Sequence, residues 1–110
     1  MLIPGDVVVA LFTYSDLSGA KIRPALVISS EGYLRETGMI VLSAISSKTV
    51  RNHFEYAIVD WSSAGLRLPS KVCVGKVMTI NKELVKKIGH LTQVDIDPIK
   101  DLADEVLYSF

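Results

Sequence analysis

The chain is organised around residues 11–30, which read LFTYSDLSGAKIRPALVISS. A polar loop over 13–22 separates two apolar runs, the pattern of two strands joined by a loop. Pro24 lacks a backbone N–H, so it fits the first residue of the second strand. Arg23, immediately before it, is either a structural corner paired with an acid such as Asp16 or a fixed cation presented to an anion.

Length and composition predict one ordered globular domain, residues 1–110. The 49% hydrophobic and 22% charged content is typical of such a domain. A lone Cys73 forms no internal disulfide, which suits a reducing compartment. No basic signal region precedes the first apolar run, and no run approaches the roughly 18 residues of a membrane span. We therefore expect a cytoplasmic protein that does not engage a membrane.

The charge is balanced overall but unevenly distributed. Twelve Lys and Arg residues offset twelve Asp and Glu residues. Residues 1–90 hold 11 basic and 7 acidic residues, whereas 91–110 hold one lysine and 5 acids. Zero net charge argues against a long nucleic-acid footprint, while the mildly basic body permits a shorter anionic ligand.

The rest of the chain predicts short strands followed by one helix. Strands are expected at 7–12, 25–29, 39–45, 54–61 and 72–80, a charged connection at 30–38, and a helical turn at 82–87 ended by Gly89. Gly75 indicates a bulge or a close backbone approach. Asp97 and Pro98 fit the start of a final helix. Its buried stripe would be Ile99, Leu102, Ala103, Val106 and Leu107.

Few residues form a recognisable chemical motif by themselves. One cysteine and two distant histidines lack metal-ligand spacing, and phosphate-loop, dinucleotide and nucleophile-elbow motifs are missing. We expect neither a metal nor a cofactor. Ser46 and Ser47 at a strand end are usually turn residues, whereas His53 in a polar loop is either solvated or a general acid or base.

Several motifs in order along the chain carry a family resemblance: Gly5-Asp6-Val7-Val8, Lys21-x-Arg23-Pro24-Ala25-Leu26, Ala44-Ile45-Ser46-Ser47, Ala64-Gly65-Leu66 and Lys87-Ile88-Gly89-His90. They resemble the MazF/PemK toxins, the growth-inhibiting members of bacterial toxin–antitoxin pairs. The resemblance covers nearly the whole chain, and the Lys-x-Arg-Pro loop is its most specific part.

That resemblance implies a mainly β, SH3-like barrel of the CcdB/MazF/PemK type with a C-terminal helix, working as a homodimer. It implies metal-independent cleavage of single-stranded RNA at short sequences. The expected partner is a cognate antitoxin whose acidic, flexible tail covers the RNA groove. Operator DNA would be reached only through that antitoxin.

The family's functional residues transfer to specific positions. Its catalytic arginine matches Arg23, and its catalytic threonine matches Ser46, which keeps the hydroxyl. Some PemK-branch relatives also use an arginine and an aspartate where this chain has Cys73 and Gly75, which puts that acid/base pair in doubt. RNA binding is expected from Phe12, Tyr14, Lys21, Ser47, Lys48, Arg51 and His53.

The implied reaction uses the 2′-OH of the RNA as nucleophile on the adjacent phosphate, leaving a 2′,3′-cyclic phosphate and a 5′-OH. Two other readings stay open. One is a non-catalytic inhibitor of the CcdB type that binds gyrase. The other is an inactive relic that binds only its antitoxin.

Overall fold

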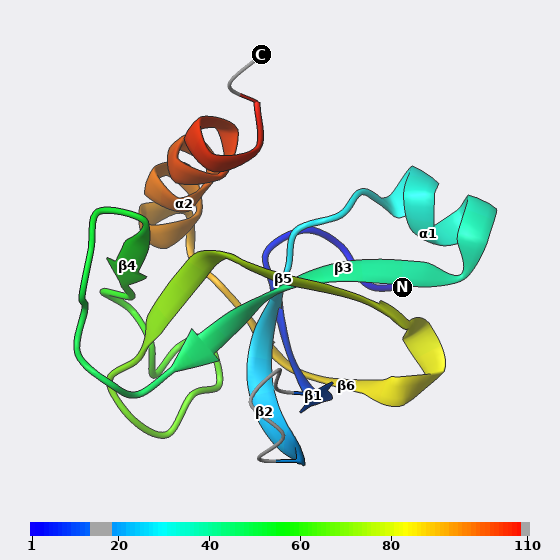
Figure 1. Cartoon of the computed structure of the whole chain (residues 1–110), viewed down its shortest axis with the longest axis horizontal. Coiled ribbons are helices and arrows are strands. Elements are labelled where there is room, and N and C mark those ends of the chain that lie inside the picture. Colours follow the sequence, from blue (N-terminus) through cyan, green and yellow to red (C-terminus); the bar gives the residue numbers. More distant parts are fainter. Residues whose placement is uncertain (14–18, 109–110) are drawn as a thin grey trace.

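The computed structural model describes residues 1–13 and 19–108 of the chain, and it consists of one six-stranded antiparallel sheet with helices (Figure 1). The strand order is β4-β5-β3-β2-β1-β6. The elements are β1 (Asp6–Thr13), β2 (Ala20–Val27), α1 (Glu31–Thr37), β3 (Met39–Ser46), β4 (Glu55–Ala57), β5 (Lys71–Asn81), the 3-10 turn η1 (Lys82–Leu84), β6 (Val85–His90) and α2 (Gln93–Leu107). The predicted mainly β fold with a C-terminal helix is confirmed.

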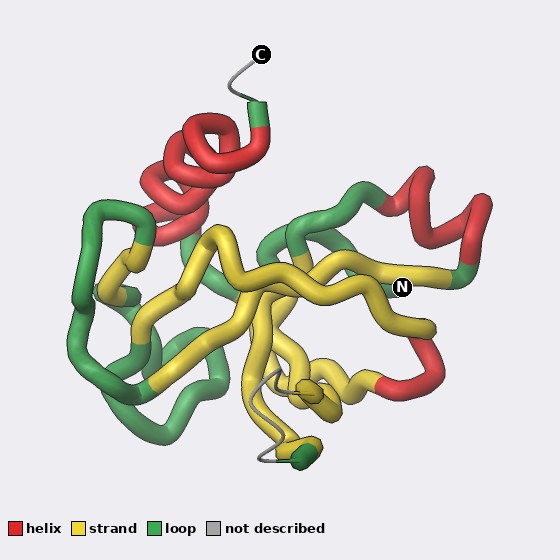
Figure 2. Tube along the Cα trace, viewed as in Figure 1, coloured by secondary structure: helices red, strands yellow, loops and turns green. Residues whose placement is uncertain are grey.

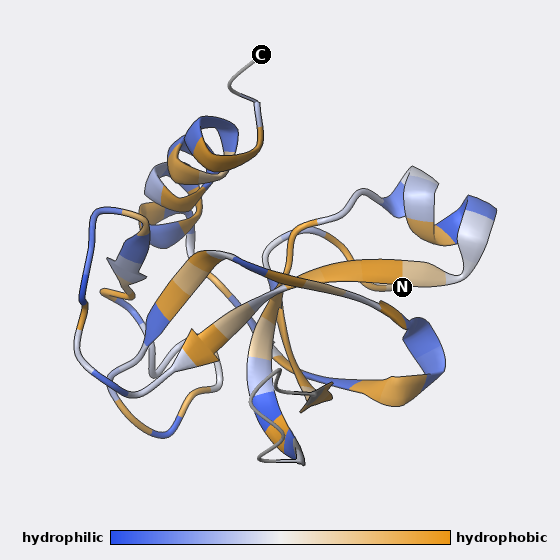
Figure 3. Cartoon of the chain, in the orientation of Figure 1, coloured by the Kyte–Doolittle hydropathy of each residue, from blue (hydrophilic) through white to orange (hydrophobic). Residues whose placement is uncertain are grey.

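Apolar side chains on both faces of the central strands build two cores. Val7 packs toward α2 with Leu26 and Ile99, whereas the adjacent Val8 packs in a second cluster with Leu34 of α1. Figure 3 shows apolar colouring along much of the central strands, and apolar and hydrophilic segments that alternate along α2. Continuous apolar runs thus fit strands covered on both sides.

β2 begins earlier than expected, and Pro24 lies inside it. β2 pairs with β1 from Ala20 to Leu26, but with β3 only from Ala25 to Val27. Pro24 therefore lies where the strand has one neighbour, which is where a sheet tolerates a missing N–H. The N-terminal part of β2, before Ala25, is not paired with the end of β3, after Ala44. The two strands therefore leave open space between these parts.

Two predicted segments have a secondary structure different from the one expected. The stretch at 30–38 contains helix α1, since the Ser30 hydroxyl accepts a hydrogen bond from the Tyr33 N–H at 3.1 Å and Gly38 adopts a left-handed φ of 70°. The helical turn at 82–87 is limited to η1, because the next residues pair with β1 as β6. Gly89 therefore lies in a strand and ends no helix. In 54–61, only β4 is a strand; the rest is loop (Figure 2).

Helix α2 starts five residues earlier than expected, with Thr92 in place of Asp97 as its N-cap residue. Its anchor is the buried Asp95, whose carboxylate accepts bonds from the Tyr56 hydroxyl at 2.7 Å and from the Val59 N–H at 2.8 Å. Burial and this carboxylate raise the pKa of Tyr56 to about 12. Four residues of the predicted stripe pack on the core, whereas Leu107 is exposed. Neither described helix is long and apolar enough to cross a membrane.

The backbone of the β4–β5 loop lies in close contact with the backbone of the edge strand β6. A Cβ on Gly89 of β6 would overlap the carbonyl of Ala64, and a Cβ on Gly65 would overlap the carbonyl of Ile88. Gly65 also has a φ of 86°, which other residues rarely adopt. The motifs Ala64-Gly65-Leu66 and Lys87-Ile88-Gly89 thus hold the β4–β5 loop against β6.

Candidate active site

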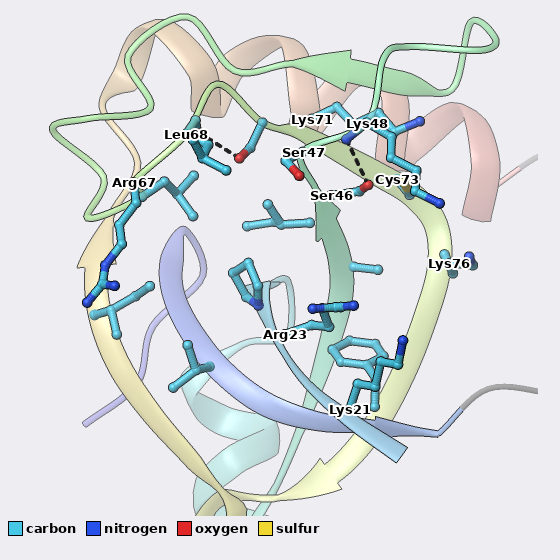
Figure 4. A pocket seen from close by; sticks show the side chains of 18 of the residues that line it. Lys21, Arg23, Ser46, Ser47, Lys48, Arg67, Leu68, Lys71, Cys73 and Lys76 are labelled. Carbon is cyan, nitrogen blue, oxygen red and sulfur yellow. Dashed lines mark hydrogen bonds between the residues drawn. The ribbon is translucent and has the colours of Figure 1, made fainter. Parts of the chain in front are cut away.

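A cavity of about 750 Å³ lies where β2 and β3 separate (Figure 4). Ala25 faces Ala44 in the last pair of that ladder. Side chains alternate along strands, so Arg23 and Ser46, two residues beyond this pair, point to the same side as each other. Both line the cavity, although they are far apart in the sequence. The other expected residues that line it are Phe12, Lys21, Ser47, Lys48 and Arg51.

The cavity wall is strongly basic. Among the described residues, seven Lys and Arg side chains line it and no Asp or Glu does. Sequence reasoning missed three of the seven, namely Arg67, Lys71 and Lys76. Arg67 lies in the β4–β5 loop, and Lys71 and Lys76 lie on β5. All three are distant from Arg23 in the sequence, and nothing in their local sequence indicates that they line the same cavity.

Ser46 has a defined hydrogen-bonding state. It is half-buried at the end of β3, and its hydroxyl oxygen accepts a bond from the Lys48 N–H at 3.2 Å (Figure 4). Since a hydroxyl both donates and accepts, its O–H remains able to donate to a ligand. The exposed Arg23 forms no ion pair with another described residue. Its possible partner Asp16 lies outside the described residues.

A buried ion pair beneath the cavity anchors the β3–β4 loop. The Glu55 carboxylate accepts bonds from Lys71 Nζ at 2.6 Å and from the Arg51 N–H at 2.7 Å. Lys71 Nζ also donates to the Thr49 carbonyl at 2.8 Å. The bond from Lys71, followed by those from Arg51, lowers the pKa of Glu55 to about 2. Glu55 thus stays ionised and holds the loop that carries Ser47, Lys48 and Arg51.

The β5 side of the cavity is irregular, as Gly75 predicted. Ser43 pairs with Val77 while Ala44 pairs with Cys73, so residues 74–76 have no partner on β3. Cys73 is 8% exposed, and its Sγ lies 3.7 Å from a Glu55 oxygen. Burial and that carboxylate raise the pKa of Cys73. A protonated thiol and a glycine supply no acid/base pair here.

Two of the expected RNA-binding residues, His53 and Phe12, are placed differently from the expectation. His53 is absent from the described lining, and its Nε2 lies 3.2 Å from Glu105 of α2. Phe12 is only 6% exposed and forms part of the floor, with no free ring face for stacking. Tyr14 lies outside the described residues. In the described part of the chain, no three His, Cys, Asp or Glu side chains could hold a metal ion.

Comparisons with solved structures give the fold. An endoribonuclease in complex with its cognate antitoxin, from a mycobacterial species, has a TM-score of 0.79 at 17% identity, over 100% of this chain and 98% of its own. A MazE-MazF complex from Deinococcus radiodurans has a TM-score of 0.75 at 19% identity, over 96% and 95%. The toxin MazF-mt6 of Mycobacterium tuberculosis has a TM-score of 0.74 at 19% identity, over 92% and 94%.

Sequence comparison gives the family. No curated protein matches the chain. A family model described as PemK-like, MazF-like toxin of type II toxin-antitoxin system matches residues 3–107. Because this match spans nearly all of the chain, the chain belongs to the PemK-like, MazF-like toxins of type II toxin–antitoxin systems.

Proposed function

We propose that this protein is a metal-independent endoribonuclease that cuts single-stranded RNA, acting as the toxin of its pair. The observation that carries this proposal is that Arg23 and Ser46 line one basic cavity from two separating strands. Two of the similar structures are endoribonucleases, which supports this proposal.

In the proposed reaction, the 2′-OH oxygen forms a bond to the adjacent phosphorus while the bond to the 5′ oxygen breaks. The 2′ proton leaves to a base, and the departing 5′ oxygen gains a proton, so the products are a 2′,3′-cyclic phosphate and a 5′-OH. DNA lacks the nucleophile, which would restrict cleavage to RNA.

Arg23 would neutralise the charge that grows on the phosphorane. Its guanidinium stays ionised and offers a planar set of donors that matches phosphate oxygens. Ser46 would donate its O–H to a non-bridging oxygen, since the Lys48 N–H already occupies its acceptor side. Lys21 and Lys48 would hold flanking phosphates.

The proposed partners are a second copy of the chain and a cognate antitoxin. Several similar structures are described as toxin–antitoxin complexes. An acidic antitoxin segment would be attracted by the seven cations of the cavity and would exclude RNA from it. Operator DNA would be reached only through the antitoxin.

The test is cleavage of a labelled transcript by purified protein in EDTA. We expect cuts with cyclic-phosphate ends from the parent and a loss of roughly 10²–10³ in kcat or more for Arg23→Ala. Arg23→Lys keeps the charge but not the fork and should be intermediate. A folded Arg23→Ala variant that cuts at the parental rate would overturn the proposal. Intact RNA together with stalled gyrase supercoiling would favour the CcdB-type alternative.

A further inference from the structure

A second, shallow hollow adjoins the basic cavity across the bulge of β5. Its described lining is Asn52, Phe54, Glu55, Cys73, Gly75 and Lys76. Cys73 and Lys76 line both spaces, so the hollow continues the cavity. A ligand strand that leaves the cavity over β5 would therefore enter it.

Phe54 gives this hollow an aromatic surface. It is 40% exposed, and its backbone is fixed at both ends, because its N–H donates to the Asn52 side-chain oxygen at 2.9 Å and its carbonyl accepts from the Val74 N–H at 3.2 Å. The His53 ring meets it edge-on, with centroids 5.0 Å apart and an interplanar angle of 73°. A ring that is already positioned loses little freedom when it binds.

The groups around the ring suit a nucleotide. Gly75 leaves the bulge without a side chain there, and Lys76 supplies a cation beside it. The side-chain oxygen of Asn52 accepts the bond from the Phe54 N–H, so its amide nitrogen supplies donors, which suit the acceptor atoms of a base. A stacking ring, an amide and a cation are the parts of a single-strand binding site.

We propose that this hollow is a nucleobase subsite in which one base next to the scissile phosphate stacks on Phe54. This inference rests on the proposed nuclease function and deepens it. His53 is then a positioning residue for the Phe54 ring, held in turn by Glu105 at 3.2 Å. The base in this subsite would contribute to the choice of cleavage sequence.

Binding is tested with fluorescein-labelled oligo(A) and oligo(U) RNA and the Arg23→Ala protein, so that the probe stays uncut. Adding Phe54→Ala should weaken binding on the order of 5- to 150-fold, whereas Phe54→Trp should keep it. Tyr33→Ala is the matched control, since Tyr33 is equally exposed and lies on α1, away from β4 (Figure 1). Thermal unfolding checks that each variant is folded.

Cleavage specificity is tested in proteins that keep Arg23, by sequencing the cut ends of a mixed transcript pool. Phe54→Ala should lose preference at one position beside the cut and leave the others unchanged. Unchanged affinity and preference would overturn the inference. So would a shift of Phe54→Ala to a smaller species in gel filtration with RNA affinity retained, since a second copy would then cover the ring. A parent that binds RNA but never cuts it refutes the nuclease proposal alone.

Discussion

At the scale of single residues, Ser46 can be tested directly, because its hydroxyl oxygen accepts a bond from the Lys48 N–H while its O–H is left to donate to a phosphate. Ser46→Ala removes the donor to the phosphate and should lower kcat by roughly 10²–10³. Ser46→Thr keeps the hydroxyl and should stay active. Single-turnover cleavage rates at saturating enzyme measure this difference. Equal rates for the alanine and threonine variants would remove Ser46 from the proposed chemistry.

Glu55 links the loop to the pH dependence of stability. Its pKa falls from 4.5 to about 2 on folding, first through its bond from Lys71. The unfolded chain therefore takes up the proton first, so this contribution is present above pH 4.5 and is lost as the pH falls toward 2. Glu55→Gln should lower stability at neutral pH and flatten its fall across this acid range.

Urea unfolding at a series of pH values measures this effect. The control is Glu31→Gln, whose partner Arg35 lies 3.7 Å away in an exposed pair on α1. Exposed pairs contribute little, so this variant should follow the parent curve. Identical curves for the parent and Glu55→Gln would show that the buried pair does not anchor the loop.

At the scale of elements, the contact between the β4–β5 loop and β6 depends on Gly89. Gly89→Ala places a methyl against the Ala64 carbonyl, and overpacking of this kind costs about 1–3 kcal/mol. Gly32→Ala is the matched control, because its Cβ meets only the Ser30 Oγ at 3.8 Å and should stabilise α1 by about 0.5–1 kcal/mol. Chemical unfolding should show a lower free energy of unfolding for Gly89→Ala and a higher one for Gly32→Ala.

At the scale of the whole molecule, the net charge is zero, yet the basic residues are concentrated around one cavity. Of its seven cations, Arg51 and Lys71 are engaged by Glu55, which leaves five. Release of about 0.7 counterions per phosphate contact on a single strand predicts a log–log salt slope of about −3.5 for RNA binding. Lys48→Ala should reduce the slope by about 0.7 without changing sequence preference. A flat salt dependence would contradict RNA binding in this cavity.

Local sequence could predict the features that local chemistry fixes. The strands at Val7 and Met39 follow from apolar β-branched runs, and the irregularity in β5 follows from Gly75. Local patterns failed where tertiary pairing overrides propensity. β6 carries Lys86 and Lys87 and reads as a helical turn, yet it is a strand because β1 offers an edge to pair with.

The sequence by itself determined the family, the mainly β fold and the two residues, Arg23 and Ser46, on which the proposed chemistry depends, because these lie in contiguous motifs. Only the tertiary structure decided what surrounds them. Lys71 lines the cavity, and Glu55 and Phe54 line the adjoining hollow. Strand register and the bulge of β5 bring these residues together although they are distant in the chain from Arg23. Register is a property of paired strands, so no single stretch of sequence encodes that neighbourhood.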